Sequence, residues 1–184
     1  MKILMGVSGG IAAYKTCEVI RRLREQDHEV QVVMSEAATH FVTPMTFQVL
    51  SGRPVATNLF DVNEEIEHLR LARWPDCIAL VPATANLLGK IAHGMADDLL
   101  TTVVLASLPE VPVVVAPAMN VAMWENPLVR ANIATLEEVG GGKRFRVVDP
   151  VEKTLACGET GQGALAEEGA ILSAIVESGR TEEG

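Results

Sequence analysis

The stretch KILMGVSGGIAAYK, residues 2–15, is an apolar run that leads through a serine–glycine–glycine turn into a helix-forming segment. The run predicts a buried strand over Lys2–Val7, and the two glycines allow a tight turn into a helix from Ile11 to Gln26. A near-continuous apolar strand followed by a helix is typical of a parallel sheet that has helices on both faces.

The same alternation of strand and helix recurs along the chain. Further strands are predicted at EVQVVM (29–34), CIALVPAT (77–84), PVVVAPA (112–118) and, as the last strand, FRVVD (145–149). Helices are predicted after Thr43-Pro44 as far as Gly52, at HLRLARW (68–74), at ANLLGKIAHG (85–94) and at ADDLLTTVVLASL (96–108). Residues 149–166 are expected to form a Gly-rich loop without regular structure. We therefore predict a Rossmann-like or flavodoxin-like doubly wound parallel α/β sheet in three layers.

Composition limits the possible partners. The chain has 184 residues and a net charge of −9, with no basic cluster of the kind that nucleic-acid binding requires. No apolar run approaches the length of about 18 residues that marks a membrane span. The three cysteines form no CxxC and no disulfide framework, and no histidine pair has metal-ligand spacing. We expect a soluble, cytoplasmic protein that binds no metal, nucleic acid or membrane.

Four segments directly follow predicted strands, and ligands of such sheets bind at the carboxyl ends of the strands. They are SGGIAA (8–13), SEAAT (35–39), PATAN (82–86) and PAMNVAMW (117–124). Gly9 and Gly10 suit a phosphate at a helix start, although the segment matches neither GxGxxG nor the P-loop pattern. A tight turn without a ligand explains these two glycines equally well. Thr84 and Asn86 could hold a phosphate, but helix capping is the simpler explanation of both.

Three further positions each have a structural and a functional explanation. A lone histidine such as His68 is more often structural or exposed than catalytic, although it could transfer a proton near neutral pH. Cys157 stands among three glycines in ACGETGQGALAE (156–167), a setting that favours a functional thiol over core packing. In PAMNVAMW, the residues Met119, Met123 and Trp124 could pack in the core or form the wall of a site.

Together these segments resemble the homo-oligomeric flavin-containing cysteine decarboxylases. The resemblance rests on SGGIAAYK (8–15), HLRLARW (68–74), PATAN (82–86), ADDLLTT (96–102), PAMNVAMW (117–124) and ACGETGQGALAE (156–167). PAMNVAMW fits the PxMNxxMW signature of the family at every fixed position, and PATAN is a common variant of its PASAN motif. The resemblance covers nearly the whole chain and implies one FMN-binding domain over residues 1–180, with a mobile substrate flap at about 150–166.

The resemblance also implies where FMN binds and how the chain assembles. The matching FMN positions are Gly9, Gly10, Ile11, Ser35, Glu36, Ala37, Thr84, Ala85, Asn86, Leu87 and Ala118. Asn120, with its neighbours Ala118 and Met119, would bind the substrate. The family forms trimers, some of which assemble into dodecamers, and its FMN lies near a subunit interface.

The chemistry that the resemblance implies is oxidation of a cysteine-derived carboxylate to a thioaldehyde, loss of CO₂, and reduction of the resulting enethiol. His68 matches the acid/base residue, Asn120 the residue that binds the carboxylate, and Cys157 the proton donor of the final reduction. Because relatives that act on peptides lack this cysteine, Cys157 favours a phosphopantothenoylcysteine substrate. The alternatives are a peptidyl-cysteine decarboxylase, a flavin prenyltransferase, and a non-catalytic FMN-binding regulator. The chain length agrees with a stand-alone enzyme.

Overall fold

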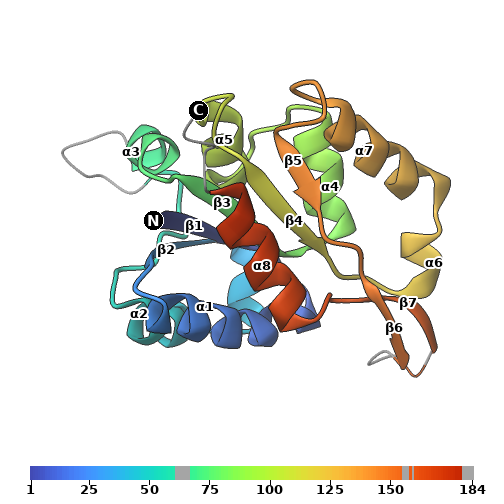
Figure 1. The fold of residues 1–184 in the computed structure, drawn as a ribbon, viewed down its shortest axis with the longest axis horizontal. Helices are drawn as coiled ribbons and strands as arrows, with labels where there is room; N and C mark the ends of the chain where they lie inside the picture. Colours follow the sequence, from blue (N-terminus) through green and yellow to red (C-terminus); the bar gives the residue numbers. More distant parts are fainter. Residues whose placement is uncertain (61–66, 155–157, 159, 180–184) are drawn as a thin grey trace.

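Five parallel strands form the central sheet, in the order β2-β1-β3-β4-β5 (Figure 1). The computed structural model describes residues 1–60, 67–154, 158 and 160–179. The strands of the sheet are β1 (Lys2–Val7), β2 (Glu29–Met34), β3 (Cys77–Ala83), β4 (Val113–Pro117) and β5 (Phe145–Val147). This is the flavodoxin-like order, in which the chain reverses its direction of winding between β1 and β3. The predicted fold class is confirmed.

Helices cover both faces of the sheet, which gives the three layers. One face packs against α1 (Thr16–Glu25), α2 (Pro44–Ser51) and α8 (Glu168–Ser178). The other packs against α3 (Glu67–Arg73), α4 (Ala85–Ala92), α5 (Leu99–Ala106) and α7 (Pro127–Glu138). Two short 3-10 helices, η1 (Ile11–Lys15) and η2 (Glu36–His40), follow β1 and β2, and the four-residue α6 (Val121–Trp124) follows β4.

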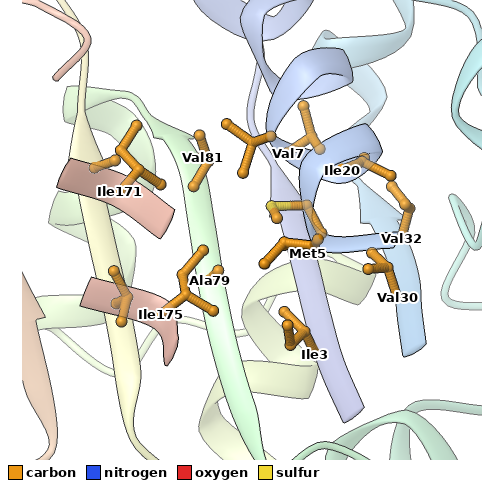
Figure 2. Packing of buried hydrophobic residues seen from close by; sticks show 14 of the residues in the cluster. Ile3, Met5, Val7, Ile20, Val30, Val32, Ala79, Val81, Ile171 and Ile175 are labelled. Atoms are coloured by element: carbon orange, nitrogen blue, oxygen red, sulfur yellow. The ribbon is translucent and has the colours of Figure 1, made fainter. Parts of the chain in front are cut away.

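Side chains of β1 to β4 alternate between two hydrophobic clusters, one on each face. Ile3, Met5 and Val7 of β1 belong to the cluster under α1 and α8, whereas Leu4 belongs to the opposite cluster. Figure 2 shows the first cluster, in which Ala79 and Val81 of β3 lie near Ile171 and Ile175 of α8. Because every strand residue from Ile3 to Val7 is buried, the strand reads as a continuous apolar run.

The structure differs from the sequence prediction at the start of the first helix and in the segment expected to be a loop. The helix predicted from Ile11 begins as the 3-10 turn η1 and becomes α-helical at Thr16. The segment expected to be an irregular loop contains an antiparallel hairpin, β6 (Val151–Thr154) and β7 (Thr160–Ala164), so β5 is not the last strand. The pattern misses this hairpin because β6 is exposed at three of its four residues and two of the five residues of β7 are glycines.

Capping fixes the junction between α4 and α5. Asp98 is the N-cap of α5; its Oδ1 accepts the Thr101 N–H at 2.8 Å, and its Oδ2 lies 3.3 Å from Lys90 Nζ in α4. Thr101 Oγ1 in turn accepts the Asp98 N–H, which completes a capping box.

We expect Asp98→Ala to destabilise the protein by about 1–2 kcal/mol, because it removes the N-cap acceptor of a largely buried helix. For a chain of this size, that loss lowers Tm by roughly 2–8 °C in a thermal melt. Asp97→Ala is the matched control, since Asp97 is more exposed than Asp98 and pairs with the same Lys90 without capping α5. An exposed pair contributes about 0–1 kcal/mol. Equal losses from the two variants would contradict the capping role.

Candidate functional site

Ser8 joins the turns that follow β1 and β3. Its hydroxyl donates a hydrogen bond to the Pro82 carbonyl at 2.7 Å and accepts one from the Thr84 N–H at 3.0 Å. Ser8 is 3% exposed, so this link lies inside the protein. Because β1 and β3 flank the point where the winding reverses, Ser8 holds together the two segments between which such folds bind ligands. No local pattern indicates this role of Ser8, apart from its position beside two glycines.

The loops after β1, β2 and β3 meet at the carboxyl edge of the sheet. A Cβ added to Gly9 would lie 2.4 Å from the Ala37 Cβ, so the Gly9 backbone lies directly against the start of η2. A Cβ on Gly10 would lie 3.4 Å from Thr84 Cγ2. The Ser35 N–H donates to the Val7 carbonyl at 3.0 Å, which brings the segment after β2 to the end of β1. The structure thus brings together three of the four segments that the sequence predicts to meet at this edge.

Thr84 is the N-cap of α4. Its Oγ1 accepts the Leu87 N–H at 3.4 Å, and its carbonyl accepts the Leu88 N–H at 3.0 Å. The capping explanation of Thr84 therefore holds, and the N–H groups of Ala85 and Asn86 precede the first helical hydrogen bond. Asn86 is exposed, whereas the Leu87 side chain is buried in the core. A ligand at this helix start would meet the Ala85 and Asn86 N–H groups and the Asn86 side chain, but not the Leu87 side chain.

Asn120 stands at the same edge, after the neighbouring strand β4. The Ala118 N–H donates to the Ala83 carbonyl at 3.1 Å, so the segment that leaves β4 lies beside the end of β3. Asn120 is the N-cap of α6, and its Oδ1 accepts the Met123 N–H at 2.8 Å. This bond fixes the orientation of the amide and leaves Nδ2, which has two N–H donors, on an exposed side chain. An amide held in this way can donate to a carboxylate.

The two large apolar residues of α6 behave differently. Trp124 is buried in the core and lies under the Arg130 guanidinium, 4.5 Å from the ring centroid. Met123 is 43% exposed. Trp124 therefore anchors the segment that carries Asn120, whereas Met123 contributes apolar surface beside it.

The chemistry of these groups fits the FMN that the resemblance implies. The starts of η1, η2 and α4 point backbone N–H groups at one edge of the sheet, and helix starts favour an anion such as a phosphate. The Ile11 side chain is 60% exposed beside them and offers apolar surface to a planar ring. Ser35, Glu36 and Ala37 at the start of η2 are partly or fully exposed, so they can be reached by a ligand.

His68 is not part of this edge within one chain. It is partly buried near the start of α3, a helix that packs against α5. Figure 1 shows α3 and α6 at opposite ends of the longest axis of the molecule. The structure therefore brings Gly10, Ser35, Thr84 and Asn120 together but leaves His68 apart from them.

Cys157 lies outside the described residues. The other two cysteines are unsuited to acid chemistry near neutral pH. Burial raises the pKa of the Cys77 thiol to about 12, and burial also raises the pKa of Cys17. Among the described residues, no group of three or more histidine, cysteine, aspartate or glutamate side chains is arranged to hold a metal. Nor does any described helix combine the length and apolarity that crossing a bilayer requires.

Comparison with known proteins gives one family and several relatives. The family model described as Flavoprotein matches residues 1–179. The probable phosphopantothenoylcysteine decarboxylase of Streptococcus mutans is 44% identical over 178 residues, which cover 96% of this chain and 97% of that protein. The chain also matches the bifunctional coenzyme A biosynthesis protein CoaBC of Vibrio vulnificus at 49% identity, but spans only 40% of its length.

Two solved structures are similar over nearly their whole chains. The first is a cysteine-to-serine mutant of PPC decarboxylase complexed with pantothenoylaminoethenethiol; it has a TM-score of 0.82 and 32% identity, with 96% of each chain covered. The second is the FMN-dependent cysteine decarboxylase SpaF, with a TM-score of 0.81 and 34% identity, and 97% of each chain covered.

Proposed function

Because the chain belongs to the Flavoprotein family, we propose that it is an FMN-dependent decarboxylase that converts 4′-phosphopantothenoylcysteine to 4′-phosphopantetheine and CO₂ in coenzyme A biosynthesis. The observation that carries this proposal is the exposed Asn120 amide, oriented by its bond to Met123 beside a set of helix starts suited to a phosphate. Relatives named for this decarboxylation match the chain along nearly its whole length. An enzyme of this pathway acts in the cytoplasm, where we expect this protein.

The residues proposed to hold FMN form two groups with different tasks. The N–H groups at the starts of η1 and α4, from Gly10 and Ile11 and from Ala85 and Asn86, would bind the phosphate end. Ile11 and Ala118 would flank the ring with apolar atoms. FMN, when bound, supplies an acceptor and donor of hydride, which is the step that side chains cannot perform. The protein supplies orientation and protons.

Asn120 is proposed to bind the substrate carboxylate through Nδ2. Because Oδ1 is already occupied by the Met123 N–H, the amide presents its donor side to the ligand. A fixed donor aligns the bond to the departing CO₂ without the entropic cost of ordering a free side chain. Ala118 and Met119, which precede Asn120, would line the same part of the site.

We propose that His68 reaches this site from a neighbouring copy of the chain. Within one chain α3 and α6 lie at opposite ends, so a site that uses both His68 and Asn120 needs two copies. Exposed apolar side chains are available for such assembly: Ile11, Tyr14, Phe41, Met45 and Val49 are between 47% and 73% exposed. A homotrimer, alone or as four trimers in a dodecamer, meets this requirement with FMN near the subunit interface.

Cys157 is proposed to donate the proton that accompanies reduction of the enethiol. We expect Cys157→Ser to release CO₂ but to accumulate the oxidised enethiol, because a serine hydroxyl is a much weaker acid than a thiol. The related PPC decarboxylase bears a cysteine-to-serine mutation and is complexed with pantothenoylaminoethenethiol, which supports this expectation. Mass spectrometry of the products measures the ratio of enethiol to saturated thiol.

The control for this variant is Cys17→Ser, which changes a partly buried thiol on α1. It should give the saturated product of the wild type. Saturated product from Cys157→Ser as well would remove Cys157 from the mechanism. The range of about 150–166, in which Cys157 falls in the sequence, is the one that we propose as the substrate flap.

A peptidyl-cysteine decarboxylase is the second candidate, because the chain is also similar to SpaF, an FMN-dependent cysteine decarboxylase. A competition experiment separates the two functions. The purified protein is given equal concentrations of 4′-phosphopantothenoylcysteine and of a peptide that ends in cysteine, and both products are quantified. We expect only the phosphopantothenoyl substrate to lose CO₂; preferential turnover of the peptide would favour the second candidate.

A further inference from the structure

The segment that carries Asn120 packs against the hairpin strand β7. The Met119 N–H donates to the Gly163 carbonyl at 3.0 Å, so the residue next to Asn120 is bonded to β7. Figure 1 shows β7 beside α6 at the end of the molecule opposite α3. The C-terminal end of β7 is fixed in turn, because Leu165 and Ala166 are buried in the hydrophobic core. A chain of contacts thus connects the core, β7 and the Asn120 segment.

Two glycines make this close approach possible. A Cβ on Gly163 would lie 2.5 Å from the Met119 carbonyl oxygen, and Gly163 has φ +154°, a conformation that other residues rarely adopt. A Cβ on Gly161 would lie 2.8 Å from Val121 Cγ2 and 3.1 Å from Val121 Cγ1. Val121 cannot easily rotate away, because a β-branched side chain in a helix has one strongly preferred rotamer.

The two contacts lie on either side of Asn120 in the sequence. Gly163 touches the residue before it, and Gly161 touches the residue after it. A displacement of β7 would therefore move both neighbours of the amide. By contrast, Gly169 in α8 has no atom within 4 Å of an added Cβ, so close packing is not a property of every glycine near the hairpin.

We propose that Gly161 and Gly163 are positioning residues: they seat β7 against the Asn120 segment and thereby set the direction in which the Asn120 amide meets the substrate carboxylate. The inference rests on the proposed function, since it takes Asn120 as the carboxylate ligand. It assigns to β7 a part in substrate orientation that is separate from the proton donation proposed for Cys157.

The test combines the single variants with a rescue. Gly161→Ala should lower kcat/KM for 4′-phosphopantothenoylcysteine by about tenfold, and Gly163→Ala by about a hundredfold, because misplacement by about 1 Å costs that much. Adding Val121→Ala to Gly161→Ala removes the clashing methyl groups and should restore kcat/KM to within about threefold of the wild type. Val121→Ala should not rescue Gly163→Ala, which meets backbone atoms. Gly169→Ala is the control and should leave kcat/KM unchanged.

Three further measurements separate positioning of Asn120 from general damage. Binding of 4′-phosphopantetheine, which has no carboxylate, should be unchanged in Gly161→Ala, and its bound FMN should equal that of the wild type. The losses from Asn120→Ala and Gly163→Ala should not add, because both act through one amide. Fully additive losses, or a Gly161→Ala variant that Val121→Ala does not restore, would overturn the proposal.

A readout independent of turnover distinguishes this inference from the proposed function. Hydrogen exchange at the Met119 amide should be faster in Gly161→Ala and Gly163→Ala, and slow again in Gly161→Ala with Val121→Ala. If the variants show this exchange pattern but the wild-type protein releases no CO₂, the proposed function is contradicted and the seating of β7 stands. Unchanged exchange in an active enzyme would contradict the seating itself.

Discussion

His68→Asn should lower kcat by about 10²–10⁴-fold, the usual contribution of a general acid or base. Asparagine keeps a polar side chain of similar size but cannot transfer a proton near neutral pH. Since the proposed FMN contacts come from the starts of η1 and α4 and from Ala118, and not from His68, the variant should bind as much flavin as the wild type, measured by its visible absorbance. His93→Asn is the control, because His93 is exposed at the end of α4, where its ring hydrogen-bonds the Gly89 carbonyl. Turnover of His68→Asn within twofold of the wild type would exclude an acid/base role.

A mixing experiment tests whether His68 comes from another copy. We expect His68→Asn chains to be inactive alone, and Asn120→Ala chains likewise. Equal amounts of the two chains are unfolded and then refolded together. If each site takes Asn120 from one copy and His68 from a neighbour, about a quarter of the sites in random trimers contain both native residues. We therefore expect about a quarter of the wild-type activity to return. Absence of recovery in mixed oligomers would place both residues in the same copy.

Asn120→Asp should lower kcat/KM by at least about a hundredfold without loss of stability. The aspartate can still accept the Met123 N–H, and its charge suits the start of α6. It cannot donate to the substrate carboxylate, and its negative charge repels that carboxylate instead. The substitution thus removes the proposed binding function of Asn120 and keeps its capping function. Asn120→Ala would remove both functions at once.

The measurements are steady-state kinetics and a thermal melt. Asn126→Asp is the matched control, because Asn126 caps α7 through the same type of bond, with its Oδ1 accepting the Leu128 N–H at 2.9 Å. That variant should keep the wild-type kcat/KM. Wild-type kinetics in Asn120→Asp would show that the Nδ2 donor is not used, whereas a large fall in Tm would show that the substitution disrupts α6.

The strands and the site edge could be predicted because their physical signals are local. Lys2–Val7 is apolar from Ile3 onward, Glu29–Met34 is rich in valine, and both segments are bounded by turns; the structure has strands with these bounds. Gly52 ends α2 in the left-handed conformation, as its position after the apolar pattern indicated. Once the strands alternate with helices in a parallel sheet, the four segments after them must share its carboxyl edge.

The remaining features depend on contacts between distant segments. The buried hydroxyl of Ser8 matters because Pro82 and Thr84 come to it, and no local pattern reports that meeting. The hairpin has few apolar residues, since β7 is seated by the absence of side chains at Gly161 and Gly163. The separation of His68 from Asn120 depends on the path of the whole chain, so sequence could relate these residues only through the family resemblance.

Direct conversion of the substrate by the purified, flavin-loaded protein tests the central claim. The protein is incubated with 4′-phosphopantothenoylcysteine, and CO₂ and the organic product are quantified together. We predict one CO₂ for each substrate consumed and saturated 4′-phosphopantetheine as the product, with no net consumption of FMN. A protein that binds FMN and leaves this substrate unchanged, at any ratio of enzyme to substrate, would contradict the account.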